Sequence, residues 1–231
     1  MIAARMFGIL FIIFLAVSAL SLIDKDPNKA PNGEMETLVI ENSVLDKDDE
    51  RWKLILVNRT HPIPDDYEVH LMTLDNGEQI DERIYPELQA MFDAARADGL
   101  QLFVAAGYRT GERQQQLMEE EIQSFLDEGY DSTEAERLAK EWVALPGTSE
   151  HQLGLAVDIN ADVRVTSSER MYEWLSEHSA AYGFIRRYPA DKTEITGIRN
   201  EPWHYRYVGK EAAGEIASRG ICLEEFLEKP I

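Results

Sequence analysis

Two short segments bring together histidines and carboxylates, the side chains that most often hold a catalytic metal. The segment SEHQLGLAVDI carries His151 and Asp158, and the segment EPWHYRYVG carries Glu201 and His204. Imidazole nitrogens and carboxylate oxygens are ligands that zinc accepts, and a catalytic zinc takes three of them from the protein. The sequence therefore predicts a zinc site made of His151, Asp158 and His204.

The position of Asp158 explains why a metal is expected. Asp158 lies in a predicted strand, on the face opposite that strand's apolar side chains. An ionised carboxylate buried there without a partner would be very costly, and the small Ala156 beside it leaves room for one. A metal ion held together with His151 meets this need.

Glu201 is the expected general base. If residues 203–208 form a strand, His204 and Arg206 share one face, whereas Glu201, at an odd spacing, points away from it. Pro202 interrupts regular pairing, so we expect Glu201 to lie on the approach to the strand and to face the same site. Three protein ligands leave one zinc position open for water, whose proton Glu201 would take during attack on an amide.

Composition excludes several other classes of protein. Lys and Arg number 23 against 43 Asp and Glu, a net charge of -20, which argues against nucleic-acid binding. The single cysteine, Cys222, rules out an intramolecular disulfide and a cysteine-based zinc finger; we expect an inert, partly buried side chain. The chain has no HExxH, SxxK or GxSxG motif, so a helical zinc-protease site and serine acyl-enzyme chemistry are not supported.

The elements that position these residues are predicted in mixed order. We expect strands at LILVN, LQLFVAAG, GLAVDIN, GFIRRY and WHYRYVG. Helices are expected at PELQAMFDAARADG, over about residues 112–128, and after N-terminal caps at Asp131 and Thr166. Because strands and helices do not alternate regularly, the pattern favours an α+β fold with a mainly antiparallel central sheet and flanking helices.

Both motifs closely resemble those of the VanY-type D-alanyl-D-alanine carboxypeptidases of the LAS zinc peptidase superfamily. The segments LILVNRTHPIPDDY, AAGYRTGERQ, PGTSEH and YGFIRRYPADKTEITGI extend the resemblance, in the same order, over about residues 52–210. The resemblance implies a LAS/Hedgehog-type zinc peptidase fold with one Zn²⁺ per chain. It also implies removal of the C-terminal D-alanine from peptidoglycan stem peptides.

Carried over by position, the resemblance assigns the metal ligands and the base as above. Arg109 matches an arginine that contacts substrate or stabilises the tetrahedral intermediate. The positions matching the substrate pocket and its wall are Gln114, Ser149, Tyr188 and Trp203. Ala106 and Thr110 replace serines that are frequent in relatives, a departure that concerns substrate contacts and not the metal site.

The N-terminal segment is predicted to direct export. Residues 7–23 form an uncharged apolar run after Arg5, which suits either a membrane-spanning anchor or a cleaved signal peptide. We therefore expect a signal peptide or signal anchor at 1–23, a polar linker at 24–50 and a zinc carboxypeptidase domain at 51–231. The domain would work outside the cytoplasmic membrane, anchored to it or secreted to the cell wall, as a monomer.

Alternatives remain open at this point. The enzyme could be an L,D-carboxypeptidase acting on tetrapeptide stems, because relatives share the zinc site and differ in pocket contacts. The chain could also be a non-catalytic wall-binding module, although such a module has no need of Glu201. The motif residues could form a metal-free polar network, and Arg109 could be an ordinary salt-bridge partner. Gln114 could face solvent on its helix, Ser149 could shape a turn, and Tyr188 could pack in the core.

Overall fold

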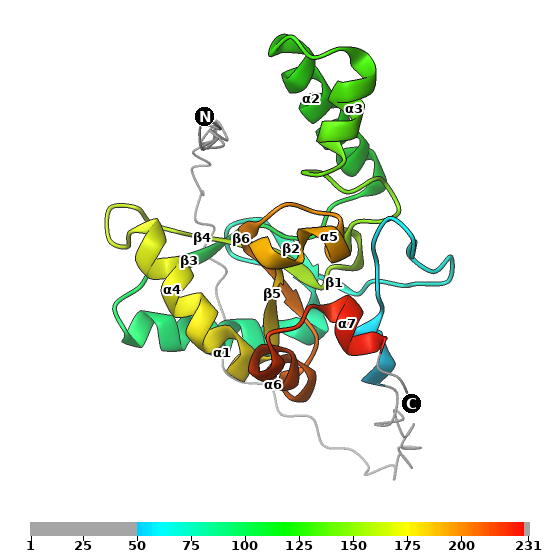
Figure 1. Cartoon of the computed structure of the whole chain (residues 1–231). Coiled ribbons are helices and arrows are strands. Elements are labelled where there is room, and N and C mark those ends of the chain that lie inside the picture. The colour runs from blue at the N-terminus through cyan, green and yellow to red at the C-terminus, as the bar shows by residue number, and fades with distance from the viewer. Residues whose placement is uncertain (1–49, 229–231) are drawn as a thin grey trace, which may run out of the picture. The chain divides into compact units, whose positions relative to one another are not determined.

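A four-stranded antiparallel sheet forms the centre of the computed structural model, which describes residues 50–228 (Figure 1). The strand order is β3-β4-β6-β5, with β3 at Leu102–Ala106, β4 at Ala156–Ala161, β5 at Phe184–Tyr188 and β6 at Glu201–Tyr207. A separate hairpin pairs β1 (Leu71–Thr73) with β2 (Gln79–Asp81). The predicted mainly antiparallel α+β fold is confirmed. The predicted segment 1–23 and residues 24–49 of the predicted linker lie outside the described residues.

Seven α-helices and five short 3-10 helices are described around the strands. The α-helices are α1 (Tyr85–Ala97), α2 (Gly111–Asp127), α3 (Ser132–Ala139), α4 (Ser168–His178), α5 (Thr193–Thr196), α6 (Lys210–Arg219) and α7 (Leu223–Leu227). The 3-10 helices are η1 (Glu50–Leu54), η2 (Glu82–Ile84), η3 (Glu150–Leu153), η4 (Ser179–Tyr182) and η5 (Ala190–Lys192). Within this part of the chain, no helix is long and apolar enough to cross a membrane.

The two faces of the sheet have different roles. Val157 and Ile159 of β4 and Tyr205 of β6 are buried in the main apolar core, to which α1 and α4 also contribute. Asp158 and His204 alternate with these residues along the same strands and so point to the other face. The main apolar core therefore lies on one sheet face, and the metal-binding side chains lie on the other.

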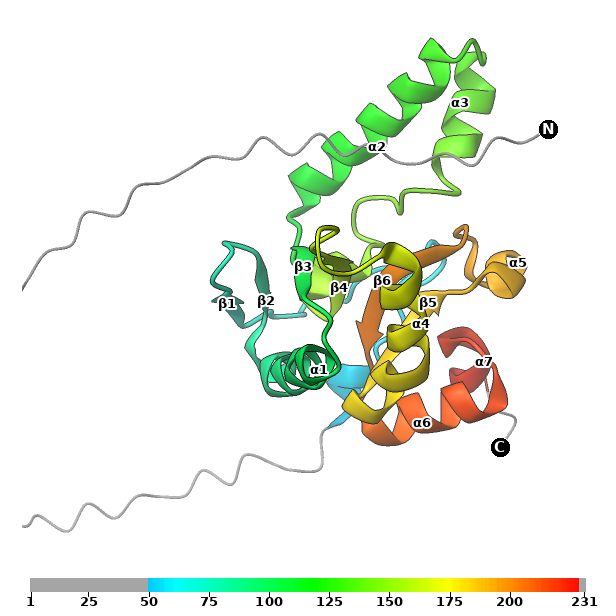
Figure 2. The ribbon, with the colours of Figure 1, turned by 90° about the vertical axis from the view of Figure 1, so that its left-hand side faces the viewer.

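Helix α2 and helix α3 form a hairpin with an apolar cluster of its own, which projects from the sheet (Figure 2). The buried members of that cluster are Met118, Phe125, Ala135, Leu138 and Ala139. Asp131 caps α3, as predicted, by accepting a hydrogen bond from the backbone N–H of Glu134. The prediction for α4 was wrong by one residue, because Ser167 is the cap and the Thr166 hydroxyl instead accepts from the backbone N–H of Gln101.

A third apolar cluster joins α6 and α7 to the sheet. Ile185 of β5 and Val208 pack there with Ile216 of α6 and Leu223 of α7. Cys222, at the start of α7, is 3% exposed, and burial raises the pKa of its thiol to about 11, as expected for an inert side chain.

The predicted strand at LILVN is wrong. Val57 is fully buried, but the segment makes no strand, and only Asn58 forms an isolated bridge, with His61. The carbonyls of Lys53 and Ile55 accept hydrogen bonds from the Arg206 guanidinium, which takes the place of a neighbouring strand. The run of apolar residues therefore reflected burial and not sheet pairing.

Candidate metal centre

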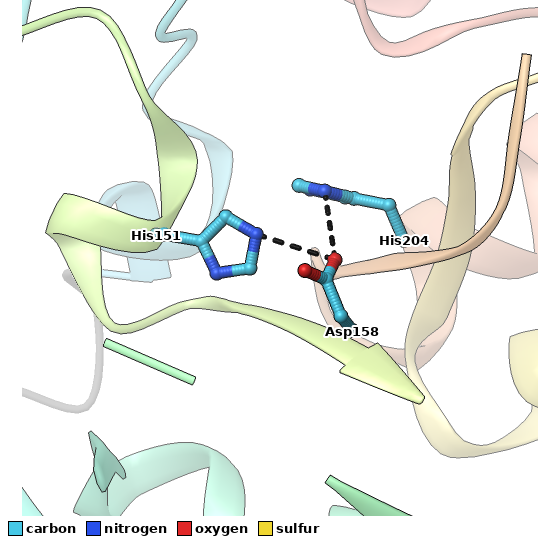
Figure 3. A group of neighbouring side chains, drawn as sticks. All are labelled: His151, Asp158 and His204. Carbon is cyan, nitrogen blue, oxygen red and sulfur yellow. Dashed lines mark ion pairs between the residues drawn. The ribbon is translucent and has the colours of Figure 1, made fainter. Parts of the chain in front are cut away.

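Asp158 and His204 face each other across the two central strands. They are direct partners in the antiparallel register of β4 and β6, and Asp158 Oδ1 lies 3.3 Å from His204 Nδ1 (Figure 3). Residues opposite each other on antiparallel strands project to the same face. The sheet itself thus sets the separation of these two side chains.

His151 reaches the same carboxylate from the short helix η3. Its Nε2 lies 3.3 Å from Asp158 Oδ1 (Figure 3). Its Nδ1 lies 2.7 Å from the carbonyl oxygen of Gly107. A Cβ added at Gly107 would lie 2.1 Å from the carbonyl oxygen of Gln79, so only glycine allows the backbone to pass here. The close approach places the carbonyl that orients His151.

The chemistry of these atoms fits a metal cation. A carbonyl can only accept a hydrogen bond, so Nδ1 of His151 carries the proton and Nε2 presents a lone pair toward Asp158 Oδ1, which also only accepts. Neither of these two atoms has a hydrogen-bond partner within residues 50–228. One ligand atom from each of His151, Asp158 and His204 lies within 4.8 Å of the others. Converging buried acceptors of this kind require a positive charge between them.

The pKa shifts agree with this fit. Burial lowers the pKa of His151 to about 4, so the imidazole is neutral at pH 7, as a ligand must be. Burial opposes ionisation of Asp158, yet His151 and Arg109 hold its pKa well below the usual range. Burial likewise works against protonated His204, but the carboxylates of Asp158, Glu150 and Glu201 raise its pKa well above the usual value. The site therefore favours positive charge beside His204, whether a proton or a metal supplies it.

Glu201 lies at the site, and strand pairing is irregular near Pro202 as predicted, but Glu201 belongs to the strand and not to its approach. Glu201 and Pro202 belong to β6, and Glu201 pairs with Tyr188 across β5. Arg186 of β5 pairs with Tyr205 of β6, and Tyr188, two residues further along β5, pairs with Glu201, four residues away on β6. This irregularity gives β6 two additional residues, and Glu201 Oε2 reaches 3.4 Å from His204 Nδ1.

Arg109 lies in the loop between β3 and α2 and binds the outer oxygen of the same aspartate. Its Nη2 donates to Asp158 Oδ2 at 2.6 Å, and both side chains are largely buried. Asp158 therefore offers one oxygen to Arg109 and the other to the two histidines. Arg109 is therefore part of the metal centre, and its ion pair with Asp158 is not an ordinary surface salt bridge.

The predicted substrate-binding residues occupy different surroundings. The Tyr188 ring is buried, and its centroid lies 4.8 Å from that of the His204 ring. Ser149 is buried at the start of η3, two residues before His151. Gln114 is buried in the first turn of α2, where its amide donates to the carbonyl of Ala144. Trp203 is half-buried on β6 next to His204.

Three buried charged residues behind the metal centre were missed by the sequence analysis. The Glu150 carboxylate accepts from Arg187 at 2.8 Å and from Arg206 at 3.0 Å, and all three side chains are fully buried. A signal was present, because Arg206 shares the strand face of His204. A guanidinium on a buried face needs an acceptor, and Glu150 stands next to His151 in the first motif.

A metal centre of two histidines and one aspartate, with a glutamate beside it, defines a metal-dependent hydrolase. The family model VanY, described as D-alanyl-D-alanine carboxypeptidase, matches residues 77–210. A D-alanyl-D-alanine carboxypeptidase from Enterococcus faecalis is 60% identical over 180 residues, which cover 78% of this chain and 67% of that protein.

Two solved structures are similar to most of the chain. One is a mutant of the vancomycin resistance D,D-pentapeptidase VanY from a VanB-type cassette, in complex with Zn(II), with a TM-score of 0.75. The other is VanYB in complex with D-alanine-D-alanine, with a TM-score of 0.76. Each is 60% identical and covers 77% of this chain and 99% of the other.

The chain belongs to the VanY family of D-alanyl-D-alanine carboxypeptidases. The predicted family, fold class and class of enzyme are therefore confirmed. The predicted zinc cofactor is confirmed as well, because a 60% identical relative was solved with Zn(II) and this chain supplies a fitting group of ligands.

Proposed function

We propose that the protein is a zinc-dependent D-alanyl-D-alanine carboxypeptidase that removes the C-terminal D-alanine from peptidoglycan stem peptides. The observation that carries the proposal is the position of Glu201. Its carboxylate lies 3.4 Å from a nitrogen of the ligand His204, at the edge of three converging metal-binding side chains. A site that only binds metal or wall has no use for a carboxylate in that place.

His151, Asp158 and His204 would hold the zinc. When bound, zinc supplies a Lewis acid that activates water and polarises the carbonyl of the scissile amide. Burial raises the pKa of Glu201 above its ordinary value, which makes it a stronger base. Glu201 accepts the proton of the attacking water and transfers it to the amine of the departing D-alanine.

Arg109 provides positive charge next to the reacting carbonyl. One of its nitrogens binds Asp158, and the guanidinium has further N–H donors for an oxygen that becomes negatively charged. Donors fixed in advance beside developing charge are usually the largest single contribution to such catalysis. We assign to Arg109 the role of stabilising the negatively charged oxygen of the tetrahedral intermediate.

A cavity lined by Tyr188, whose ring packs against the ring of the ligand His204, would hold part of the stem peptide. The walls of this cavity include Asn58, Ala144 and Thr148. Ser149 follows Thr148 directly, and the Gln114 amide donates a hydrogen bond to the Ala144 carbonyl. We assign Tyr188, Ser149, Gln114 and the neighbouring Trp203 to the substrate pocket. The relative solved with D-alanine-D-alanine supports a dipeptide of this chemistry as the recognised end.

We also propose that the enzyme acts outside the cytoplasmic membrane, as a monomer. The apolar run of residues 7–23 supports export, either as an anchor in the membrane or as a signal that is removed. Fractionation of cells, followed by N-terminal sequencing of the mature chain, separates the two. Recovery of the protein in the cytoplasm would contradict both.

The L,D-carboxypeptidase alternative is not favoured, because the 60% identical relatives are a D-alanyl-D-alanine carboxypeptidase and a D,D-pentapeptidase. The deciding experiment gives the zinc-loaded protein a pentapeptide ending in D-Ala-D-Ala and the matching tetrapeptide, side by side. We expect D-alanine to be released from the pentapeptide only, or from the pentapeptide much faster than from the tetrapeptide. Faster cleavage of the tetrapeptide would favour the alternative, and no cleavage of either would overturn the proposal.

A further inference from the structure

Glu150 is a buried carboxylate whose two oxygens have different surroundings. Its Oε1 accepts hydrogen bonds from both Arg187 and Arg206. Its Oε2 has no hydrogen-bond partner within the described residues. Two guanidinium groups thus fix the carboxylate in place and keep it ionised, while one oxygen remains to be satisfied.

That remaining oxygen faces the metal ligand His204. Oε2 of Glu150 lies 3.6 Å from Nε2 of His204, slightly beyond hydrogen-bond distance. Nε2 of His204 is itself buried, and the described part of the chain offers it no other hydrogen-bond partner. A donor and an acceptor that are both buried and otherwise unsatisfied favour each other. The opposite nitrogen, Nδ1, is the one that faces Asp158.

We propose that Glu150 is a positioning residue for zinc binding: it accepts the Nε2 proton of His204 and so presents the Nδ1 lone pair of that ring to the metal. The inference rests on His204 as a zinc ligand, which is part of the proposed function. A carboxylate behind a ligating histidine fixes the proton on one nitrogen and makes the other a better ligand. The two histidines then bind through different nitrogens, His151 through Nε2 and His204 through Nδ1.

Residues far along the chain hold Glu150 in this position. Arg187 donates to Glu224 of α7 at 2.6 Å and 2.9 Å while it donates to Glu150 on its other side. Asn58 in turn donates to Glu224 at 3.1 Å. Arg206 donates to Glu150 separately, so the position of Glu150 does not depend on Glu224. The two arginines and two glutamates have no net charge, as a buried cluster requires.

The first test is made on the full-length wild-type protein, with an NMR-active cadmium isotope in place of zinc and labelled histidine nitrogens. We expect metal–nitrogen coupling to Nδ1 of His204 and to Nε2 of His151. The Nε2 proton of His204 should exchange slowly with solvent. Coupling to Nε2 of His204, or an Nε2 proton that exchanges freely, overturns the proposal without any variant having to fold.

The second test measures zinc affinity by competition with a chelator. In Glu150→Gln, an amide cannot satisfy both arginines and accept from His204, and we expect zinc to bind about 10- to 100-fold more weakly. Glu224→Gln is the matched control, because it also removes a buried carboxylate from Arg187 but does not touch His204. We expect its zinc affinity to stay within about 2-fold of wild type, the scatter found between sites that do not interact.

The two variants give distinct outcomes. Equal loss of zinc affinity in both variants would mean that Arg187 pairing alone matters and would overturn the role of Glu150, as would unchanged affinity in Glu150→Gln. Neither measurement uses peptide hydrolysis. A protein that binds metal as described but cleaves no stem peptide would sink the proposed function and leave this inference standing.

Discussion

Asp158 and His204 are direct partners in the register of β4 and β6, with Oδ1 and Nδ1 3.3 Å apart. Their separation is set by backbone hydrogen bonds of the central strands and not by a loop. A site on rigid strands keeps its geometry when the ligand leaves. The chain can therefore be expected to hold its metal-binding side chains close to their final positions before zinc binds.

Removal of zinc should abolish activity and leave the fold intact. The apolar core lies on the opposite sheet face from the metal centre, so the far-ultraviolet circular dichroism spectrum of chelated protein should match that of the loaded protein. At a free zinc concentration about 100 times Kd, binding contributes about 2.7 kcal/mol, so chelation should lower Tm by about 5 to 10 °C. Zinc should restore both activity and Tm; an unfolded spectrum after chelation would contradict this view.

Replacement of Glu201 should separate metal binding from catalysis. In Glu201→Gln the amide keeps the shape of the side chain but cannot take a proton, so kcat should fall by about 10²- to 10⁴-fold. Zinc content, measured by atomic absorption, should stay at one per chain. Glu211→Gln, at an exposed position of α6, is the control and should behave as wild type. Retained activity in Glu201→Gln would remove Glu201 from the mechanism.

Replacement of Arg109 should affect both the reaction and the metal. Arg109→Ala removes the donor to Asp158 Oδ2 and the positive charge for the intermediate, so we expect kcat/KM to fall by about 10²- to 10³-fold. Zinc should also bind more weakly, as measured by chelator competition. Arg113→Ala is the matched control, because Arg113 pairs with Glu120 in an exposed position on α2. Similar losses in both variants would contradict a specific role for Arg109.

The Arg187–Glu224 pair should make stability depend on pH. Burial tends to raise the pKa of Glu224, but Arg187 outweighs it and holds the pKa below the ordinary value. A depressed pKa contributes stability that is present above the unfolded pKa of about 4.3 and is lost as the pH falls through the folded pKa. Glu224→Gln lacks this contribution at every pH.

The measurement compares Tm of wild type and Glu224→Gln between pH 7 and pH 3, both with zinc removed so that protons do not compete with metal. At pH 7 the variant should be less stable by about 3 kcal/mol, the usual result of breaking a buried pair. The difference should shrink below about pH 4 as Glu224 takes up a proton. A difference that stays constant or grows on acidification would show that the carboxylate is not ionised in the folded protein.

The strands around the site could be predicted because their side chains alternate clearly. In β4 the apolar residues take one face and Asp158 the other, which was sufficient to place the aspartate at a site. The position of Glu201 beside His204 could not be derived in the same way, because it depends on an irregularity of the β5–β6 register between Arg186 and Tyr188. A period of two predicts faces only where pairing is regular.

The network behind His204 was missed for a related reason. Arg206 alone gave a signal, because it shares the strand face of His204, and only the packing of β5, β6 and η3 brings Glu150 and Arg187 to it. The same limit applies to the segment at residues 54–58, where apolar composition predicted a strand. The carbonyls of Lys53 and Ile55 instead accept hydrogen bonds from Arg206. Long-range partners of this kind leave no local pattern.

Two connections join the α2–α3 hairpin to the rest of the domain. One is the loop that carries Arg109, and the other is the segment that ends at Ser149. Gln114 and Ala144 tie the two connections together by a hydrogen bond of 2.7 Å. A tilt of the hairpin would therefore displace the connection that carries Arg109 and the connection that ends at Ser149 together. Crosslinks or antibodies directed at the tip of this hairpin would act on the enzyme's working geometry from a distance.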